Sequence, residues 1–234
     1  MREEILREGI LADKFLARDP DVPTFGINLA CAWPFPEAWR EPHAELAAHL
    51  TKSGPWLYVY PHAFTHITLV TFITFSRHVA PSPADRREME SLIEKIVTTI
   101  EPALKNDFAD GINSFKLQPR TLVLARAAGI LPLENPDGQV QRLRDSVLSA
   151  VRSDEALHRE LAARGLNVPG IIHSTLLRFT QPPPDVGEFL ARFDEAANAV
   201  KFPPIRVQEL LLTAETRPYM RGGSVVKRFP LAGN

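Results

Sequence analysis

The chain has 234 residues, of which 44% are hydrophobic and 24% charged, and its 27 Lys and Arg against 28 Asp and Glu give a formal net charge of −1. This balance argues against a protein that coats duplex DNA, because such binding depends on many contacts between Lys or Arg and phosphates. The chain has one cysteine, Cys31, so it cannot form an intrachain disulfide, and Cys31 is expected to be buried in the core. No apolar run approaches the length of a membrane span. We therefore expect a cytoplasmic protein without a membrane partner.

Hydrophobic periodicity and turn residues predict a mixed series of helices and strands. In chain order these are a helix over 2–18, a strand over 24–33, a helix over 37–51, strands over 56–61 and 66–75, a helix over 85–105, strands over 112–118 and 121–126, a long helix over 138–164, a strand over 170–179, a helix over 185–200, and strands over 205–216 and 224–231. The order favours an α+β fold with mostly antiparallel sheet. We expect 1–20 to be an N-terminal helical extension and 21–234 a single domain, because no linker divides it.

Two heptapeptides in predicted strands share a pattern. Residues 66–72 read HITLVTF and residues 173–179 read HSTLLRF, so both have His, Thr, Leu and Phe at the same places. Side chains alternate between the faces of a strand, so His66 and Thr68 share one face, about 7 Å apart. His173 and Thr175 share a face in the same way. Strict alternation places Thr71 and Arg178 on the opposite faces, so neither is expected to contact a ligand of the histidines.

Two such strands facing each other across a cleft would present two imidazoles and two hydroxyls to one anion. One histidine can take a proton from an attacking hydroxyl while the other gives one to the leaving oxygen. Thr68 and Thr175 can donate to the phosphoryl oxygens as negative charge develops. This chemistry needs no metal or other cofactor, because histidine titrates near neutrality. A metal pair of His62 and His66 is disfavoured, because a predicted turn separates them and no carboxylate stands at a suitable spacing.

The repeated His-x-Thr motif, each time in a strand that a helix follows, resembles the two-histidine (2H) phosphoesterase superfamily, which includes the LigT-like RNA 2′,3′-cyclic phosphodiesterases. The stretches LAAHLTKSGPWLYVYPHAFTHITLVTF and VQELLLTAETRPYMRGGSVVKRFPL resemble the flanks of the family's first motif and its closing hairpin. The resemblance covers most of 24–231. It implies a bilobal fold with two pseudo-symmetric antiparallel sheets, helices outside and a central groove lined by both motifs. Ser174 replaces a usual apolar residue, and the separation of the histidines exceeds that of compact bacterial members, which places extra length in 128–165 and leaves the substrate open.

The resemblance implies a metal-independent phosphodiesterase that opens a 2′,3′-cyclic or 2′-linked phosphodiester on a nucleotide or short RNA end. His66 and His173 would be the acid and base, in an order that the sequence does not fix. Tyr219 and Trp33, near predicted strand ends, could stack on a base, and packing at the core or rim is the alternative for each. The other functions considered are trimming of RNA 3′ ends, hydrolysis of ADP-ribose cyclic phosphate, and non-catalytic binding of a nucleotide or RNA end. The oligomeric state is open, with a monomer favoured.

Overall fold

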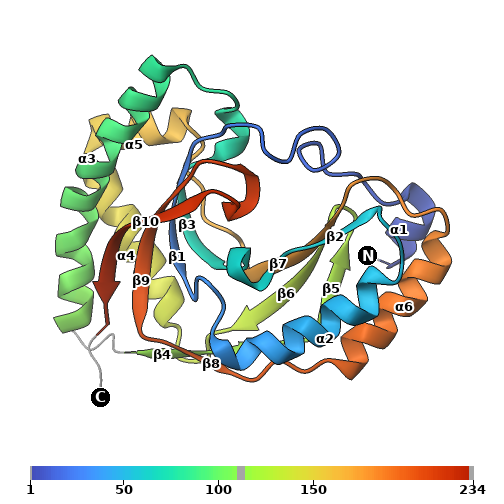
Figure 1. Cartoon of the computed structure of the whole chain (residues 1–234). Coiled ribbons are helices and arrows are strands. Elements are labelled where there is room, and N and C mark those ends of the chain that lie inside the picture. The colour runs from blue at the N-terminus through green and yellow to red at the C-terminus, as the bar shows by residue number, and fades with distance from the viewer. Residues whose placement is uncertain (1, 110–113, 232–234) are drawn as a thin grey trace.

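A computed structural model of the chain describes residues 2–109 and 114–231, which form two antiparallel sheets with helices outside (Figure 1). The four-stranded sheet has the order β10-β9-β1-β3 and consists of β1 (Gly26–Cys31), β3 (Ile67–Ile73), β9 (Glu209–Glu215) and β10 (Gly223–Pro230). The six-stranded sheet has the order β2-β7-β6-β4-β8, with β5 paired to β6. Its strands are β2 (Leu57–Val59), β4 (Phe115–Pro119), β5 (Val123–Ala125), β6 (Ala128–Glu134), β7 (Ile172–Phe179) and β8 (Ile205–Val207). The predicted α+β fold is confirmed.

The longer helices cover the outside of the two sheets (Figure 1). Three of them lie beside the four-stranded sheet: α3 (Pro83–Ala109), α4 (Gln139–Ser153) and α5 (Glu155–Ala163). On the side of the six-stranded sheet lie α2 (Arg40–Thr51) and α6 (Val186–Ala199), which pack on each other. Short 3₁₀ helices occur at η1 (Glu37–Trp39), η2 (His62–Phe64), η3 (Phe75–Arg77) and η4 (Pro218–Met220). No helix within the described ranges is long and apolar enough to cross a membrane.

The structure differs from the predicted elements at four places. The predicted strand over 205–216 is two strands, β8 and β9, which belong to different sheets. The first helix, α1 (Arg2–Glu8), is shorter than predicted because Gly9 adopts a left-handed φ of 77° and ends it. The predicted helix over 138–164 is broken at Asp154, whose side chain caps α5 by accepting a hydrogen bond from the backbone N–H of Leu157 at 3.0 Å. Strand β6 was not predicted; it contains Pro132, a residue that is rare inside sheets. Residues 112–113 of the predicted strand 112–118 lie outside the described residues.

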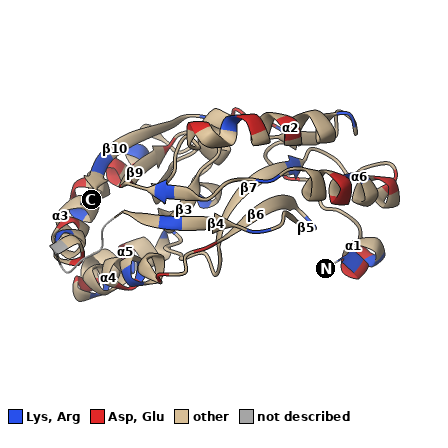
Figure 2. Cartoon of the chain, turned by 90° about the horizontal axis from the view of Figure 1, so that it is seen from below, with Lys and Arg blue, Asp and Glu red and all other residues tan. Residues whose placement is uncertain are grey.

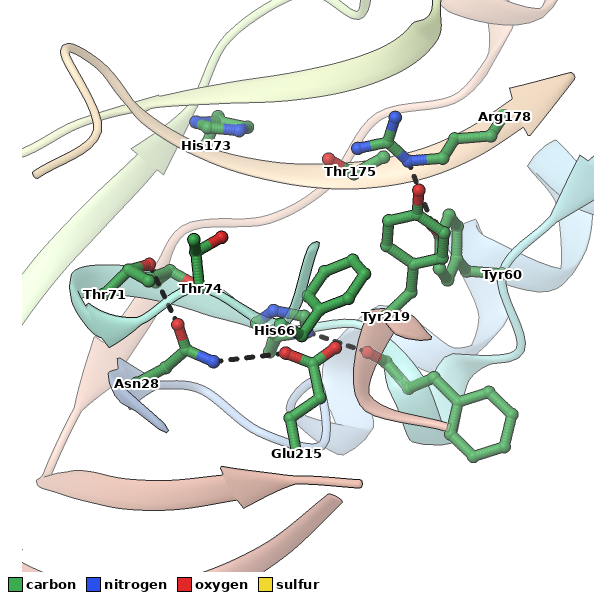
Figure 3. Close-up of a pocket in the computed structure, with 13 residues that line it drawn as sticks. Asn28, Tyr60, His66, Thr71, Thr74, His173, Thr175, Arg178, Glu215 and Tyr219 are labelled. Atoms are coloured by element: carbon green, nitrogen blue, oxygen red, sulfur yellow. Dashed lines mark hydrogen bonds between the residues drawn. The ribbon is translucent and has the colours of Figure 1, made fainter. Parts of the chain in front are cut away.

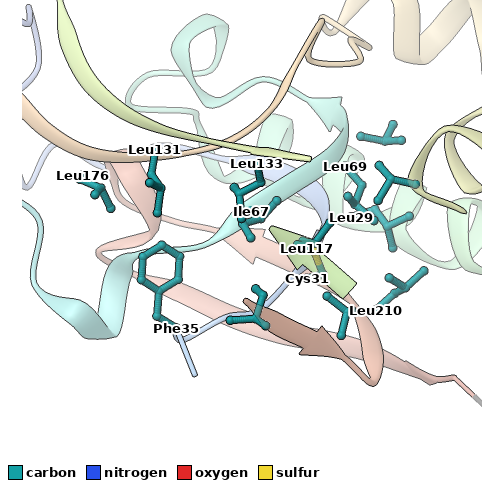
Figure 4. Close-up of a cluster of buried hydrophobic side chains, with 14 of the residues drawn as sticks. Leu29, Cys31, Phe35, Ile67, Leu69, Leu117, Leu131, Leu133, Leu176 and Leu210 are labelled. Atoms are coloured by element: carbon teal, nitrogen blue, oxygen red, sulfur yellow. The ribbon is translucent and has the colours of Figure 1, made fainter. Parts of the chain in front are cut away.

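A single hydrophobic core joins the two sheets (Figure 4). Leu29 and Ile67 enter it from the four-stranded sheet, and Leu131 and Leu176 enter it from the six-stranded sheet. Each such side chain contributes about 1.5–3 kcal/mol when it is fully buried. Cys31 lies in the same core, where burial raises the pKa of its thiol to about 12, so the expectation of buried packing is confirmed. This core fixes β3 and β7, the strands that carry the two motifs, in contact with each other.

Candidate active site

A cavity of about 170 Å³ lies between the two sheets, and both motifs reach it (Figure 3). His66 immediately precedes β3 and Thr68 lies within it, whereas His173 and Thr175 both belong to β7. The structure therefore places all four side chains around one cavity, two from each sheet. The other lining residues are Asn28, Tyr60, Phe64, Thr71, Thr74, Phe75, Arg178, Glu215 and Tyr219.

The two histidines are oriented by equivalent hydrogen bonds. Nδ1 of His66 lies 2.9 Å from the carbonyl oxygen of Phe64, and Nδ1 of His173 lies 3.3 Å from that of Ile171. A carbonyl oxygen can only accept, so in each ring Nδ1 carries the proton. The neutral ring then has an unprotonated Nε2, the form in which an imidazole can accept a proton from a substrate.

Both histidines favour the neutral form in the free protein. Burial lowers the pKa of His66, and a positive charge on His173 lowers it further, while the hydrogen bond to the Phe64 carbonyl acts in the opposite direction. Burial also lowers the pKa of His173, and the nearby charges of Arg144 and Arg178 add to this effect. A bound phosphate would favour the protonated form of either ring.

Thr71 lies on the cavity side of β3, so the prediction that it points away from the histidines is wrong. Successive residues of β1 pair with Thr68 and Val70, which leaves Leu69 as the extra residue of a β-bulge. Leu69 and Val70 are both buried as a result. The alternation of faces is reset after the bulge, and Thr71 returns to the face of Thr68.

Strand β7 has a bulge at the equivalent place, and it brings Arg178 to the cavity, contrary to prediction. Successive residues of β6 pair with Leu177 and Thr175, so Leu176 is the extra residue of the bulge. Leu176 and Leu177 are both buried, so the next residue returns to the face of Thr175. Gly129 is needed opposite the bulge, because a Cβ at that position would lie 2.7 Å from Cγ of Leu177.

Arg178 is held at the cavity by three partners. Its Nε donates to the hydroxyl oxygen of Tyr60 at 3.1 Å, and its Nη1 donates to Oδ2 of Asp13 at 3.3 Å. The guanidinium carbon lies 4.5 Å from the centre of the Tyr219 ring. A planar guanidinium fixed in this way has further N–H groups with which it can bind an anion.

A chain of hydrogen bonds runs along the other side of the cavity (Figure 3). Thr71 Oγ1 donates to Asn28 Oδ1 at 2.9 Å, and Asn28 Nδ2 donates to Glu215 Oε2 at 3.4 Å. Burial raises the pKa of the Glu215 carboxyl group to about 7, although hydrogen bonds from Met220 and Asn28 oppose the increase. Glu215 is therefore a titratable group inside the cavity near neutral pH.

Glu215 also supports the turn that carries Tyr219. Tyr219 and Met220 have φ values of 62° and 61°, in the left-handed region that costs energy for residues other than glycine. The backbone N–H of Met220 donates to Glu215 Oε1 at 2.8 Å. This hydrogen bond stabilises the turn in the conformation that places the Tyr219 ring at the cavity.

Trp33 does not line this cavity, although the sequence suggested it together with Tyr219. Its Nε1 donates to the carbonyl oxygen of Ala63 at 3.2 Å, and its ring borders a separate depression near Arg206 and Gln208. We therefore do not propose Trp33 as a substrate contact. Within 2–109 and 114–231, no group of three or more His, Cys, Asp or Glu side chains is placed to hold a metal ion.

Sequence reasoning missed Asn28 and Glu215 as well as the two residues behind the bulges. Asn28 is the one amide in the apolar strand GINLAC, and Glu215 ends the apolar run LLLTAE. A polar residue inside a buried strand needs a hydrogen-bond partner, and that was the available signal. The sixth position of both heptapeptides is also polar, which a strictly alternating strand does not explain.

Comparison with solved structures finds similar folds. TT0787 of Thermus thermophilus has 17% sequence identity and a TM-score of 0.55, over 89% of this chain and 99% of that chain. ATU0111 of Agrobacterium tumefaciens, described as a conserved protein of unknown function, has 12% identity and a TM-score of 0.54, over 92% and 90%. Escherichia coli LigT complexed with 3′-AMP has 18% identity and a TM-score of 0.46, over 90% and 99%. No protein-family model and no curated protein matches the chain.

The chain thus has an α+β fold with two antiparallel sheets flanked by helices, as predicted, and TT0787 and ATU0111 have a similar fold. At these identities, the likeness to TT0787 and ATU0111 concerns the fold alone.

Proposed function

We propose that the chain is a 2H phosphoesterase that hydrolyses a phosphodiester by metal-independent acid and base catalysis. One observation carries the proposal: two His-x-Thr pairs, from different sheets, line the same cavity, and a backbone carbonyl contacts Nδ1 of each imidazole, which leaves Nε2 available for proton transfer. Two coincidental histidines would not be expected to share the backbone hydrogen bond, the neighbouring threonine and the bulge that follows.

The proposed reaction requires two proton transfers. One histidine, neutral, accepts a proton from water as the water oxygen bonds to phosphorus. The other histidine, protonated, gives its proton to the leaving oxygen as the P–O bond breaks. The first ring then holds the proton that the second has lost, and exchange with solvent restores both. In this proposal Thr68, Thr175 and Arg178, which line the cavity, donate to the non-bridging oxygens, where negative charge develops.

The proposed substrate is a 2′,3′-cyclic or 2′-linked phosphodiester on a nucleotide or short RNA end. The cavity is smaller than the roughly 300–1,000 Å³ of pockets that enclose a drug-sized ligand, so it suits a phosphoryl group with the remainder of the ligand at its mouth. Phe64, Phe75 and Tyr219 supply aromatic surface against which a base could stack. Basic and acidic residues are interspersed on the outer helices α2 and α3, which is unlike the basic stripe of a protein that binds long nucleic acid (Figure 2).

A panel assay tests this function. The purified chain, with and without EDTA, is incubated with nucleoside 2′,3′-cyclic phosphates, 2′–5′ oligonucleotides, RNA ending in a cyclic phosphate, and ADP-ribose cyclic phosphate. We expect hydrolysis of a cyclic or 2′-linked diester that survives the chelator. Activity that EDTA abolishes and added zinc or manganese restores would contradict the metal-independent mechanism.

The same panel separates the alternative functions. Preferred cleavage of ADP-ribose cyclic phosphate, or stepwise shortening of an RNA 3′ end, would retain the chemistry and change the substrate. Binding without turnover of any member would indicate a binding module. A polymer-binding protein would also lose about 10³–10⁵-fold in affinity between 50 and 200 mM salt, whereas one to three phosphate contacts predict a modest loss.

A further inference from the structure

The segment between α1 and β1 packs behind the wall of the cavity, against residues that line it. Figure 1 shows it running from the side of the six-stranded sheet to the four-stranded sheet. It is attached to the six-stranded sheet by two backbone hydrogen bonds, from Leu11 N–H to the Arg126 carbonyl at 2.8 Å and from Asp13 N–H to the Phe179 carbonyl at 2.7 Å. Phe15 then packs against the cavity residue Phe75, with ring centres 5.2 Å apart.

Asp13, a charged residue of this segment, forms hydrogen bonds with the cavity residues Arg178 and Tyr219. It is only 7% exposed, and both carboxylate oxygens have donors. Oδ1 accepts from the backbone N–H groups of Phe15 and Leu16, each at 3.0 Å. Oδ2 accepts from Nη1 of Arg178 at 3.3 Å and from the hydroxyl of Tyr219.

The pairing matters because fixed positive charge at the cavity is scarce. Arg178 is the only Lys or Arg among the described residues that line the cavity. Arg144 lies behind β3, where it is buried and donates to the Leu69 carbonyl at 3.1 Å. A phosphate bound by Arg178 would therefore lie near the Asp13 carboxylate, which repels each negative charge that the phosphate carries.

We infer that Asp13 is a specificity-determining residue: by pairing with Arg178, it makes the cavity favour a singly charged phosphodiester over a doubly charged phosphomonoester. This inference rests on the proposed function. It means that the N-terminal segment, through Asp13, influences which phosphate ester the cavity binds. A cyclic phosphodiester carries one negative charge, whereas the monoester formed by its hydrolysis carries nearly two above pH 7. Asp13 would thus weaken product binding more than substrate binding.

The test compares two ligands at pH 8 in the full-length chain with both histidines replaced (His66→Ala, His173→Ala), so that neither ligand is consumed. Dissociation constants are measured by calorimetry for adenosine 2′,3′-cyclic phosphate and for adenosine 3′-monophosphate. Asp13→Asn keeps an acceptor for the neighbouring N–H groups and removes the charge. We expect it to raise the affinity for the monoester, relative to the cyclic diester, by roughly 5- to 30-fold.

Two further comparisons test whether the effect belongs to the charge of Asp13. Asp19→Asn removes a charge from an exposed position of the same segment, and the affinity ratio should stay unchanged because solvent screens that charge. If Asp13→Asn does not fold, because Arg178 then lacks its counter-charge, Asp13→Asn with Arg178→Gln is compared with Arg178→Gln alone. The double replacement should again shift the ratio toward the monoester.

The outcomes separate this inference from the proposed function. If Asp13→Asn changes the ratio of the monoester and diester affinities by less than 2-fold, relative to the variant with only the histidines replaced, the role of Asp13 is overturned. The same holds if the ratio shifts toward the diester. Neither result contradicts the proposed nucleotide site. If the chain with both histidines intact neither binds nor hydrolyses the cyclic diester, the proposed function and this inference both fall.

Discussion

Thr71 and Arg178 occupy equivalent positions in the two halves of the cavity. Each follows its histidine by five residues, and each reaches the cavity because a bulge resets the strand after the threonine. The two halves nevertheless differ at this position, since one carries a neutral hydroxyl and the other a guanidinium. The cavity is therefore symmetric in its histidines and threonines and asymmetric in charge. This asymmetry would give the proposed phosphodiester substrate a preferred orientation.

The histidines give the first prediction. His66→Ala and His173→Ala should each lower kcat by about 10²–10⁴-fold, the usual contribution of a positioned proton-transfer group. The double replacement should lose much less than the product of the two losses, because the pair acts as a unit. Steady-state kinetics on the best substrate of the panel measures both effects. Two losses that simply multiply would mean that the histidines act independently.

The threonines give the second prediction. Thr68→Val and Thr175→Val keep the β-branched shape and remove the donor, so each should lower kcat/KM by about 10- to 100-fold if the hydrogen bond forms mainly in the transition state. Thr68→Ser should lose little. Thr98→Val, at an exposed position of α3, is the control and should leave activity unchanged. A loss in Thr68→Ser as large as in Thr68→Val would show that the side-chain shape, and not the hydroxyl, matters.

Arg178 gives the third prediction. Arg178→Lys keeps the charge and loses the planar fork that Tyr60 and Asp13 hold, so kcat/KM should fall by about 10- to 100-fold. Arg228→Lys, on the exposed part of β10, is the matched control. Thr71→Val should also lower activity, because it breaks the hydrogen bond to Asn28. Full activity in Arg178→Lys would show that the residue is structural.

The pH dependence of activity gives the fourth prediction. The proposed mechanism requires one neutral and one protonated histidine, and burial lowers the pKa of both His66 and His173 from the ordinary 6.5. The singly protonated pair is then most populated below pH 6.5, so the bell-shaped profile of kcat/KM, which reports the free enzyme, should peak there. The profile of kcat should peak at a higher pH, because a bound phosphate raises both pKa values. A maximum of kcat/KM above pH 7 would contradict this prediction.

Glu215 gives the fifth prediction, which concerns stability. Its pKa is about 7 in the folded chain, against 4.5 for an ordinary Glu, so the folded state binds the proton more tightly than the unfolded state. The stabilisation from this group is fully present below pH 4.5 and is lost as the pH rises through 7. Glu215→Gln should therefore raise Tm relative to the parent at pH 8 by more than at pH 5, with a difference in the free energy of unfolding of up to about 3 kcal/mol. Glu90→Gln, an exposed replacement on α3, should show no such difference between thermal unfolding at the two pH values.

The sequence predicted the features of the site that depend on local pattern. His66 and Thr68, like His173 and Thr175, lie two residues apart before any bulge, so strand alternation was sufficient to place them on one face. The order of elements and the resemblance predicted the two sheets.

The remaining features depend on contacts between distant parts of the chain. The bulges at Leu69 and Leu176 are defined by their pairing with β1 and β6, which the sequence of one strand does not reveal. Likewise, Asp13 reaches Arg178 only because the N-terminal segment is attached to β7 of the six-stranded sheet, and an amphipathic pattern over 2–18 gave no sign of it.

The four-stranded sheet has a consequence for how the chain is made. Its central strand β1 lies near the N-terminus and pairs on one side with β9, so that Leu29 meets Leu212. The sheet whose strand β3 begins just after His66 therefore cannot be completed until β9 and β10 have left the ribosome. Pairing between such distant segments slows folding, and until β9 arrives, one edge of β1 remains open to other chains. Nascent chains that stop before β9 would lack Glu215 and the Tyr219 turn and would expose an unpaired apolar strand, which makes them substrates for chaperones or proteases.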